Sequence, residues 1–291
     1  MLRSLAIYTI ACAAFALLVR LLLPRLLTWR GVWFRWHTRF GPALVFDSAD
    51  EDGTTVRLLN VNGTYQSVCY VDEDLLWVPV CAYHRTWGTE VRRRFGAPAA
   101  PRGTTPDDEP EAQRDTTPGD APTTPSRRAL VMGGGGYSFP KWLVAYRPDF
   151  SCEVVEIDPS IEQIAREQFF LDRLVEEFRT EQNGRLSLRT GDAWDCLLAD
   201  EQGFDLIVND AFGGNRPLGR LSTTEGAQAI RAHLREGGLY IGNVRTPLEG
   251  RGSQVLHATE EAFAREFSHV RVIPECPEEP RRKGNNTLVA W

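Results

Sequence analysis

The sequence predicts an α/β protein with a doubly wound, mostly parallel seven-stranded sheet, preceded by a small antiparallel β domain and an N-terminal hydrophobic helix. Three observations support this prediction. The apolar run at 129–132 leads directly into the four glycines at 133–136. A second apolar run, at 153–157, contains the acidic residue Glu156 near its end. Over residues 128–291, strand and helix patterns alternate, which is typical of a parallel sheet with helices on both faces.

Composition limits the classes of partner. The chain has 291 residues, of which 42% are hydrophobic, and this is enough for a packed core. Its net charge of −6 predicts no nucleic-acid partner, because such partners need a clustered basic face. The cysteines lack the paired spacing of zinc sites, and neither histidines nor carboxylates cluster with ligand spacing. We therefore expect ordinary buried thiols and no metal.

The first predicted region, 1–40, is a membrane-anchor helix with a basic and aromatic collar. Residues 5–19 carry no charge, and apolar character resumes after Arg20. A spanning helix needs about 20 residues, a length reached here if Arg20 extends its charge toward the headgroups. Only Arg3 precedes the segment whereas several arginines follow it, so the positive-inside bias places the remaining chain in the cytoplasm. The collar residues Trp29, Trp33, Phe34 and Trp36 resemble an interfacial aromatic belt.

Two alternatives to an anchor stay open at this point. A cleaved signal peptide would need a small-residue cleavage site after the apolar segment, and arginines and tryptophans stand there instead. An amphipathic helix could also lie on a membrane surface or on a partner subunit.

The second and third predicted regions are a β domain at 41–95 and a linker at 96–127. The runs at 43–46, 55–61 and 65–71 have strand character, and Asn62-Gly63 between the last two is a strong hairpin signal. The linker is rich in Pro, Thr, Asp, Glu, Gly and Ala and holds few large apolar residues, so we expect it to be disordered.

The fourth region, 128–291, is predicted to be a Rossmann-like nucleoside-binding domain. Its expected strands are 129–132, 153–157, 186–189, 206–209, 239–244, 270–273 and 286–291. Its expected helices are 140–146, 160–170, 224–234 and 254–267. Pro159 after Asp158, and Thr223-Thr224 before Glu225, have the chemistry of helix starts.

The predicted ligand site lies at the carboxyl ends of these strands, where doubly wound sheets bind ligands. Glycines at 133–136 let the backbone pack closely against a nucleoside. Glu156 is placed to accept hydrogen bonds from ribose hydroxyls. Asp192, after the third strand, and Asp210, after the fourth, complete the acidic set.

In order and spacing, four motifs resemble those of the spermidine synthase (polyamine aminopropyltransferase) family. They are Val131-Met132-Gly133-Gly134-Gly135-Gly136, Val155-Glu156-Ile157-Asp158, Gly191-Asp192-Ala193 and Asn209-Asp210-Ala211-Phe212. The hairpin at 59–67 with Gln66, and the pair Tyr83-His84, also resemble the family. The resemblance covers about 44–291 apart from the linker, and it implies a methyltransferase-like sheet.

The resemblance implies a role for each site residue. The co-substrate, decarboxylated S-adenosylmethionine or S-adenosylmethionine, would contact Gly133, Gly134, Gly135, Gly136, Glu156, Asp158, Asp192, Ala193 and Gln66. Glu156 would hold the ribose and Asp192 the adenine amino group. Asp210 would orient and deprotonate the attacking amine. Tyr83, His84 and Tyr137 would shape the acceptor pocket, and the family's pairing of subunits makes a homodimer possible.

Two positions depart from the family pattern. Gly136 stands where the family carries an aspartate that holds the aminopropyl ammonium, and Gly213 stands where it carries a second aspartate for the polyamine. Desolvating an ammonium without a counter-charge is costly, so these losses weigh against a polyamine acceptor and against a preference for the decarboxylated co-substrate.

Structural roles are open for the same residues. Asp210 could cap a helix or turn, Glu156 could be a solvated charge at a strand end, and Asp192 could belong to an ordinary Gly-Asp turn. His84 and Tyr137 could simply pack.

Three functions therefore stay open. The first is a transferase that alkylates an amine-type acceptor, anchored to a membrane and facing the cytoplasm. The second is an S-adenosylmethionine-dependent methyltransferase. The third is a catalytically silent nucleoside-binding protein tethered at the membrane.

Overall fold

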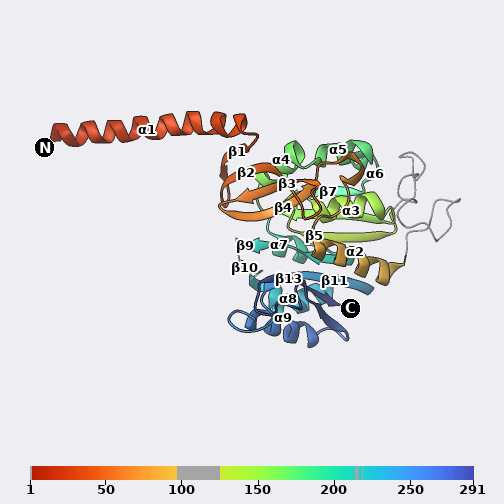
Figure 1. Ribbon diagram of the computed structural model, residues 1–291. Helices are drawn as coiled ribbons and strands as arrows, with labels where there is room; N and C mark the ends of the chain where they lie inside the picture. Colours follow the sequence, from red (N-terminus) through yellow and green to blue (C-terminus); the bar gives the residue numbers. More distant parts are fainter. Residues whose placement is uncertain (1, 97–124, 214–215, 218) are drawn as a thin grey trace.

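The computed structural model describes residues 2–96, 125–213, 216–217 and 219–291. It contains an N-terminal helix, a four-stranded antiparallel sheet and a seven-stranded mostly parallel sheet (Figure 1), so the predicted fold class is confirmed. Most of the predicted linker at 96–127 lies outside the described residues, and so do parts of the loop after Gly213.

The small sheet is formed by β1 (Trp33–Thr38), β2 (Gly41–Ala49), β3 (Thr55–Val61) and β4 (Thr64–Tyr70), in that order. The predicted turn between β3 and β4 is present, with φ values of 50° at Asn62 and 79° at Gly63. Positive φ at both positions gives the turn the twist that matches the two flanking strands.

Two segments near this sheet differ from the sequence prediction. The collar residues of β1 form an edge strand paired with β2, and Trp33 packs against the main core. Aromatic side chains favour a half-buried strand as well as a membrane interface, which is why the sequence left this ambiguous. The segment after the 3-10 turn η1 (Glu73–Leu75) forms helix α2 (Ala82–Phe95), an element that was not predicted within the β domain. Its buried residues His84, Trp87 and Val91 recur at helical spacing.

The large sheet has the strand order β12-β13-β11-β8-β5-β6-β7. Its members are β5 (Arg127–Met132), β6 (Phe150–Glu156), β7 (Leu186–Thr190), β8 (Phe204–Asn209), β11 (Leu234–Thr246), β12 (Val270–Ile273) and β13 (Gly284–Ala290). β13 runs antiparallel to both of its neighbours. All seven strands were predicted from the sequence, although several extend further than expected.

Helices cover both faces of this sheet. They are α3 (Ser138–Tyr146), α4 (Pro159–Gln168), α5 (Leu171–Glu177), α6 (Thr180–Asn183), α7 (Ala193–Leu198), α8 (Thr224–His233) and α9 (Gln254–Ala264). The short helices α5, α6 and α7 were not predicted, because one or two turns give little periodicity. Alternate residues of β5 enter different cores: Val131 packs on the α2–α3 side and Met132 on the α8–α9 side.

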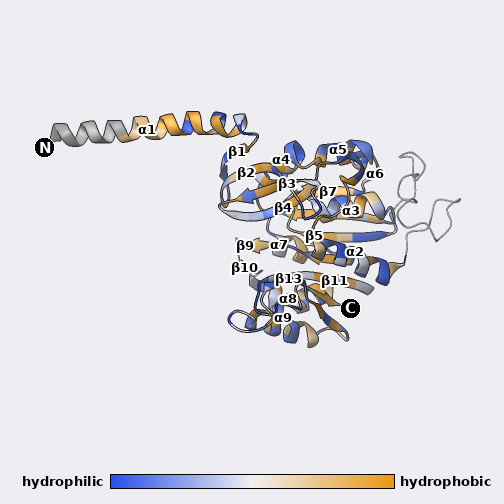
Figure 2. Cartoon of the chain, viewed as in Figure 1, coloured by the Kyte–Doolittle hydropathy of each residue, from blue (hydrophilic) through white to orange (hydrophobic). Residues whose placement is uncertain are grey.

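Helix α1 (Leu2–Trp29) projects from the body of the molecule (Figure 1) and is largely apolar along the coloured part of its length (Figure 2). Among the described residues, α1 is the one helix that is both long enough and apolar enough to cross a membrane. Its most apolar window is Cys12–Trp29. None of that window is buried. Length and composition alone are weak support for a membrane span.

Candidate functional site

A cavity of about 890 Å³ lies between the small sheet and the carboxyl edge of the large sheet. The sequence-predicted residues that line it are Gln66, Tyr83, His84, Gly133, Gly134, Gly135, Glu156, Asp192, Ala193 and Asp210. Residues of the β domain and of the nucleoside-binding domain therefore line the cavity together. Its position is the one at which doubly wound sheets bind their ligands.

The glycine loop forms the floor of this cavity, and two of its glycines are required by geometry. Gly133 has φ +96°, and a Cβ there would lie 2.6 Å from the carbonyl oxygen of Asp210. A Cβ on Gly134 would lie 2.7 Å from the ring of Tyr137. A larger residue at Gly133 would therefore push the loop away from the backbone that follows β8, and one at Gly134 would collide with the buried ring of Tyr137.

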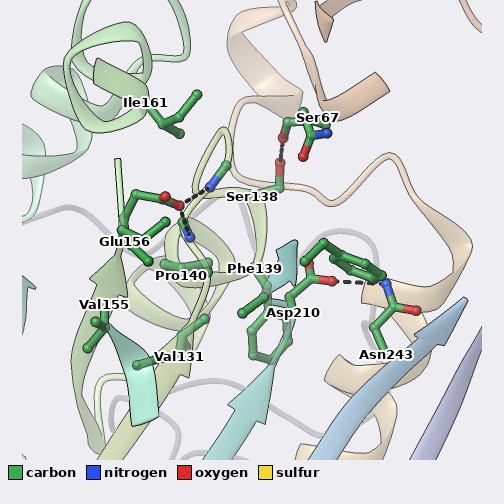
Figure 3. A pocket seen from close by; sticks show the side chains of 18 of the residues that line it. Ser67, Val131, Ser138, Phe139, Pro140, Val155, Glu156, Ile161, Asp210 and Asn243 are labelled. Atoms are coloured by element: carbon green, nitrogen blue, oxygen red, sulfur yellow. Dashed lines mark hydrogen bonds between the residues drawn. The ribbon is translucent and has the colours of Figure 1, made fainter. Parts of the chain in front are cut away.

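Glu156 ends β6 beside this loop and is 8% exposed. One carboxylate oxygen accepts hydrogen bonds from the backbone nitrogens of Gly134 at 2.8 Å and Gly135 at 3.4 Å (Figure 3). The other accepts from the nitrogen of Asp158 at 3.0 Å. Glu156 thus holds the loop in place, and the second oxygen retains a lone pair for a ligand hydroxyl.

Asp192 and Ala193 lie on the cavity wall at the start of α7. Asp192 is exposed and caps this helix, since its carboxylate accepts from the nitrogen of Trp194 at 2.8 Å. The indole of Trp194 lies beneath Arg220, whose guanidinium carbon is 5.4 Å from the ring centroid. Both of these residues line the cavity, and the sequence analysis did not single them out.

Three predicted site residues do not line the cavity. Asp158 is 2% exposed, caps α4 through the nitrogen of Ser160 and accepts from the nitrogen of Arg39 at 2.5 Å. Tyr137 is fully buried in a left-handed conformation beneath the glycine loop. Burial, reinforced by Glu156, raises the pKa of the Tyr137 phenol well above its usual range. Gly136 is also buried, facing Ser67 and Phe169.

The space at Gly136 leaves no room for the family's aspartate. A Cβ there would lie 2.5 Å from Ser67 Oγ and 2.8 Å from Phe169 Cδ1. Gly136→Asp should therefore lower the free energy of unfolding by roughly 1–3 kcal/mol through overpacking. Chemical denaturation measures this, with Gly184→Asn as the control, because Gly184 has open space and a left-handed φ that Asn tolerates. An aspartate accommodated at wild-type stability would show that the loop relaxes.

Asp210 lies across the cavity from Glu156, in the loop after β8 (Figure 3). One of its oxygens accepts from Asn243 Nδ2 at 2.9 Å. The other is 3.3 Å from His84 Nε2 and 3.5 Å from the Tyr83 hydroxyl. Burial, with a further contribution from Asp210, raises the pKa of Tyr83 well above its usual range, so the phenol stays protonated and donates. The predicted pair Tyr83-His84 and Asp210 therefore meet, although they are far apart in sequence.

Asparagines on β11 and β13 extend this cluster and were missed by the sequence analysis. Asn243 Nδ2 is also 3.4 Å from Asn285 Oδ1, and Asn285 donates to the carboxylate of Glu275. Cys81 lines the cavity nearby, where burial, then Asp210 and Glu275, raises the pKa of its thiol to about 12. Asn243 lies within an otherwise apolar stretch of its strand, and this was the signal in the sequence that could have predicted a polar cluster, because a buried amide needs hydrogen-bond partners.

Within the described residues, no group of three or more His, Cys, Asp or Glu side chains has the geometry of a metal site.

Comparison with known proteins gives matches by sequence and by structure, while no family model matches the chain. A probable polyamine aminopropyl transferase from Bifidobacterium longum (strain NCC 2705) is 31% identical over 125 residues, which is 43% of this chain and 26% of that protein. A polyamine aminopropyltransferase from Vibrio vulnificus (strain CMCP6) is 32% identical over 119 residues, 40% of this chain and 37% of that protein. The matches thus span about a quarter of the first relative and little more than a third of the second.

Among solved structures, a probable spermidine synthase from Corynebacterium glutamicum ATCC 13032 matches with a TM-score of 0.63 and 20% identity, over 89% of this chain and 79% of that one. A spermidine synthase in complex with the transition-state analogue AdoDATO matches with a TM-score of 0.55 and 15% identity, over 89% and 73% of the two chains. At these identities the structural matches establish the fold. Taken with the sequence matches, they show that the chain is similar to polyamine aminopropyltransferases and spermidine synthases.

Proposed function

We propose that this protein is a transferase that binds an S-adenosyl sulfonium nucleoside and alkylates an amine, with aminopropyl transfer from decarboxylated S-adenosylmethionine as the favoured reaction. The observation that carries the proposal is the placement of Asp210. This carboxylate faces the cavity opposite Glu156, and Tyr83, His84 and Asn243 hold it there. The names of the matched relatives support the same reaction class.

The chemistry follows from this placement. The nucleoside would lie over the glycine loop, with its ribose on Glu156 and its adenine toward Asp192. An amine held about 3–3.5 Å from the carbon next to sulfur is then positioned for in-line displacement. The amine lone pair forms the new N–C bond, the C–S electrons return to sulfur as a neutral thioether nucleoside, and Asp210 accepts the amine proton.

Methyl transfer from S-adenosylmethionine is the second candidate, and one observation favours it. The wall beside the glycine loop carries the hydroxyls of Ser67 and Ser138, 3.5 Å apart, and has no carboxylate at position 136. The Ser138 hydroxyl donates to the carbonyl oxygen of Val68 at 2.9 Å, which leaves the Ser67 hydroxyl to donate to the carboxylate of intact S-adenosylmethionine. A lone ammonium would instead need a counter-charge.

Calorimetry on the full chain tests these alternatives. Decarboxylated S-adenosylmethionine, S-adenosylmethionine and methylthioadenosine are titrated separately. Tighter binding of the decarboxylated form supports aminopropyl transfer, and tighter binding of the carboxylated form supports methyl transfer. Binding of none of the three would leave only a silent tethered protein.

We propose in addition that α1 anchors the enzyme in a membrane with the catalytic domain in the cytoplasm, and that the protein pairs into a homodimer. A reporter fused after Trp291 should then be active on the cytoplasmic side, because arginines follow the apolar segment. Activity of an exported reporter at the same position would reverse this orientation.

A further inference from the structure

Strand β1 folds back along α1 rather than continuing away from it. The Trp36 indole nitrogen donates to the carbonyl oxygen of Arg20 at 3.4 Å, and an Arg20 guanidinium nitrogen lies 3.4 Å from His37 Nε2. A small hollow between the two elements is lined by Phe15, Ala16, Val19, Arg20, Trp36 and His37. The end of β1 is therefore level with Arg20, well before the end of the helix at Trp29.

This contact fixes how deep α1 can enter a bilayer. β1 is an edge strand, and its unpaired backbone groups cannot lie in hydrocarbon without a large cost. With α1 in a bilayer as proposed, the hydrocarbon would therefore end near Arg20, and the apolar part of α1 from Leu21 to Trp29 would lie at headgroup level and beyond. The part of α1 before Arg20 is about 27 Å long at 1.5 Å per residue, close to the roughly 30 Å of a bilayer core. Arg20 and Trp36 then lie at headgroup level, where such side chains are favoured.

The hairpin formed by β1 and β2 also contributes to the wall of the cavity. Arg39 and Phe40, in the turn that follows β1, line it together with Tyr65, which is 66% exposed, and Phe212 of β9 (Phe212–Gly213). Figure 1 shows β1, β2, β9 and β10 (Arg216–Pro217) on the side of the body from which α1 projects. The rim of the cavity and the headgroup-level residues thus lie at the same side of the molecule.

The charges along the cavity suit an acceptor with one amine. The lining carboxylates Glu156, Asp192 and Asp195 lie at the nucleoside side, which leaves Asp210 for the acceptor. The exposed residues Arg39 and Arg220 also line the cavity, and guanidinium groups pair well with phosphate.

We propose that the cavity opens onto the membrane surface and that its acceptor is an amine-bearing phospholipid, whose primary amine reaches Asp210 while its phosphate stays at the arginine rim. This inference rests on the proposed amine alkylation for the identity of the acceptor and on the proposed membrane anchor for the position of the rim. The placement of the rim at the membrane is independent of catalysis.

The placement is tested by photolabelling the full chain in phosphatidylcholine vesicles that carry a diazirine in the headgroup region. Peptides containing Trp36–Phe40 and Tyr65 should be labelled well above the remote helix α9, which serves as the internal control. Trp36→Ala should reduce labelling at Arg39 and Phe40, whereas Trp29→Ala should not, because Trp29 is 79% exposed. Equal labelling of the rim and α9 would overturn the placement.

The acceptor is tested in the same vesicles with decarboxylated S-adenosylmethionine and, in parallel, S-adenosylmethionine. Phosphatidylethanolamine in the vesicles is compared with soluble phosphoethanolamine at equal total concentration. Membrane confinement of enzyme and acceptor should make the lipid react at least about tenfold faster. Equal or faster reaction of the soluble amine would overturn the lipid acceptor and leave the proposed function standing. If neither amine is alkylated while the nucleoside still binds in calorimetry, the lipid acceptor is also overturned. Loss of nucleoside binding as well would reject the proposed function itself.

Discussion

Replacing Asp210 with asparagine is expected to lower the rate of alkyl transfer by about 10²–10⁴-fold, the usual contribution of a general base. The asparagine amide fills the same space but cannot accept the amine proton. Nucleoside affinity should change little, because Asp210 lies across the cavity from Glu156. Single-turnover kinetics and calorimetry on the same preparation measure the two quantities separately.

The matched control for this variant is Asp195→Asn, which removes a lining carboxylate from α7 at the nucleoside side. Its transfer rate should stay close to that of the wild type once the nucleoside is saturating. If Asp210→Asn keeps the wild-type rate, Asp210 is an organising residue for Tyr83, His84 and Asn243, and another group must take the proton.

Replacing Glu156 with alanine is expected to weaken nucleoside binding by roughly 1–3 kcal/mol, through loss of charge-assisted hydrogen bonds to the ribose. Glu156 also accepts from the nitrogens of Gly134, Gly135 and Asp158, so this variant loosens the glycine loop as well. Glu156→Gln separates the two effects, because its carbonyl oxygen can still accept from Gly134 while the charge is gone.

Calorimetry with methylthioadenosine and thermal melts of both variants make the distinction. If the ribose contact dominates, both variants lose affinity to a similar extent. The alanine variant loses more stability, because it gives up all of the backbone hydrogen bonds to Glu156, whereas the glutamine variant keeps an oxygen for the glycine loop and gives up only the bond from Asp158. Glu162→Gln is the control, because Glu162 pairs with Arg166 on α4 and does not line the cavity. Unchanged affinity in both Glu156 variants would mean that the ribose site is misassigned.

Much of the fold was predictable because its signals are local. β5 and β6 are runs of buried apolar residues, and the turn at Asn62-Gly63 needs positive φ at both positions. Glycines 133 and 134 are dictated by close approach, which only glycine permits. Each of these features depends on a few neighbouring residues, so the amino-acid order reveals it.

Other features depended on contacts between distant segments. Trp36 has side-chain chemistry that fits either a membrane interface or a strand, and its pairing within β1 was decided by β2. The residues of α2 were assigned to the β domain with no helix predicted, but they form a helix whose Trp87 donates to the hydroxyl of Thr287 on β13. Tyr137 and Gly136 follow the glycine turn in sequence, yet the left-handed turn directs them beneath the loop and away from the cavity.

The sequence by itself determined the α/β class, the position of the glycine turn and the acidic residues at the ends of three strands, because short apolar runs and their terminating residues encode strand ends directly. Only the tertiary structure decided which groups surround Asp210. Tyr83, Asn243 and Asn285 come from α2, β11 and β13. They meet because β11 ends, antiparallel β13 begins and α2 packs at the same edge of the large sheet. No local pattern specifies that meeting, since it depends on strand order, crossover and the docking of one sheet against another.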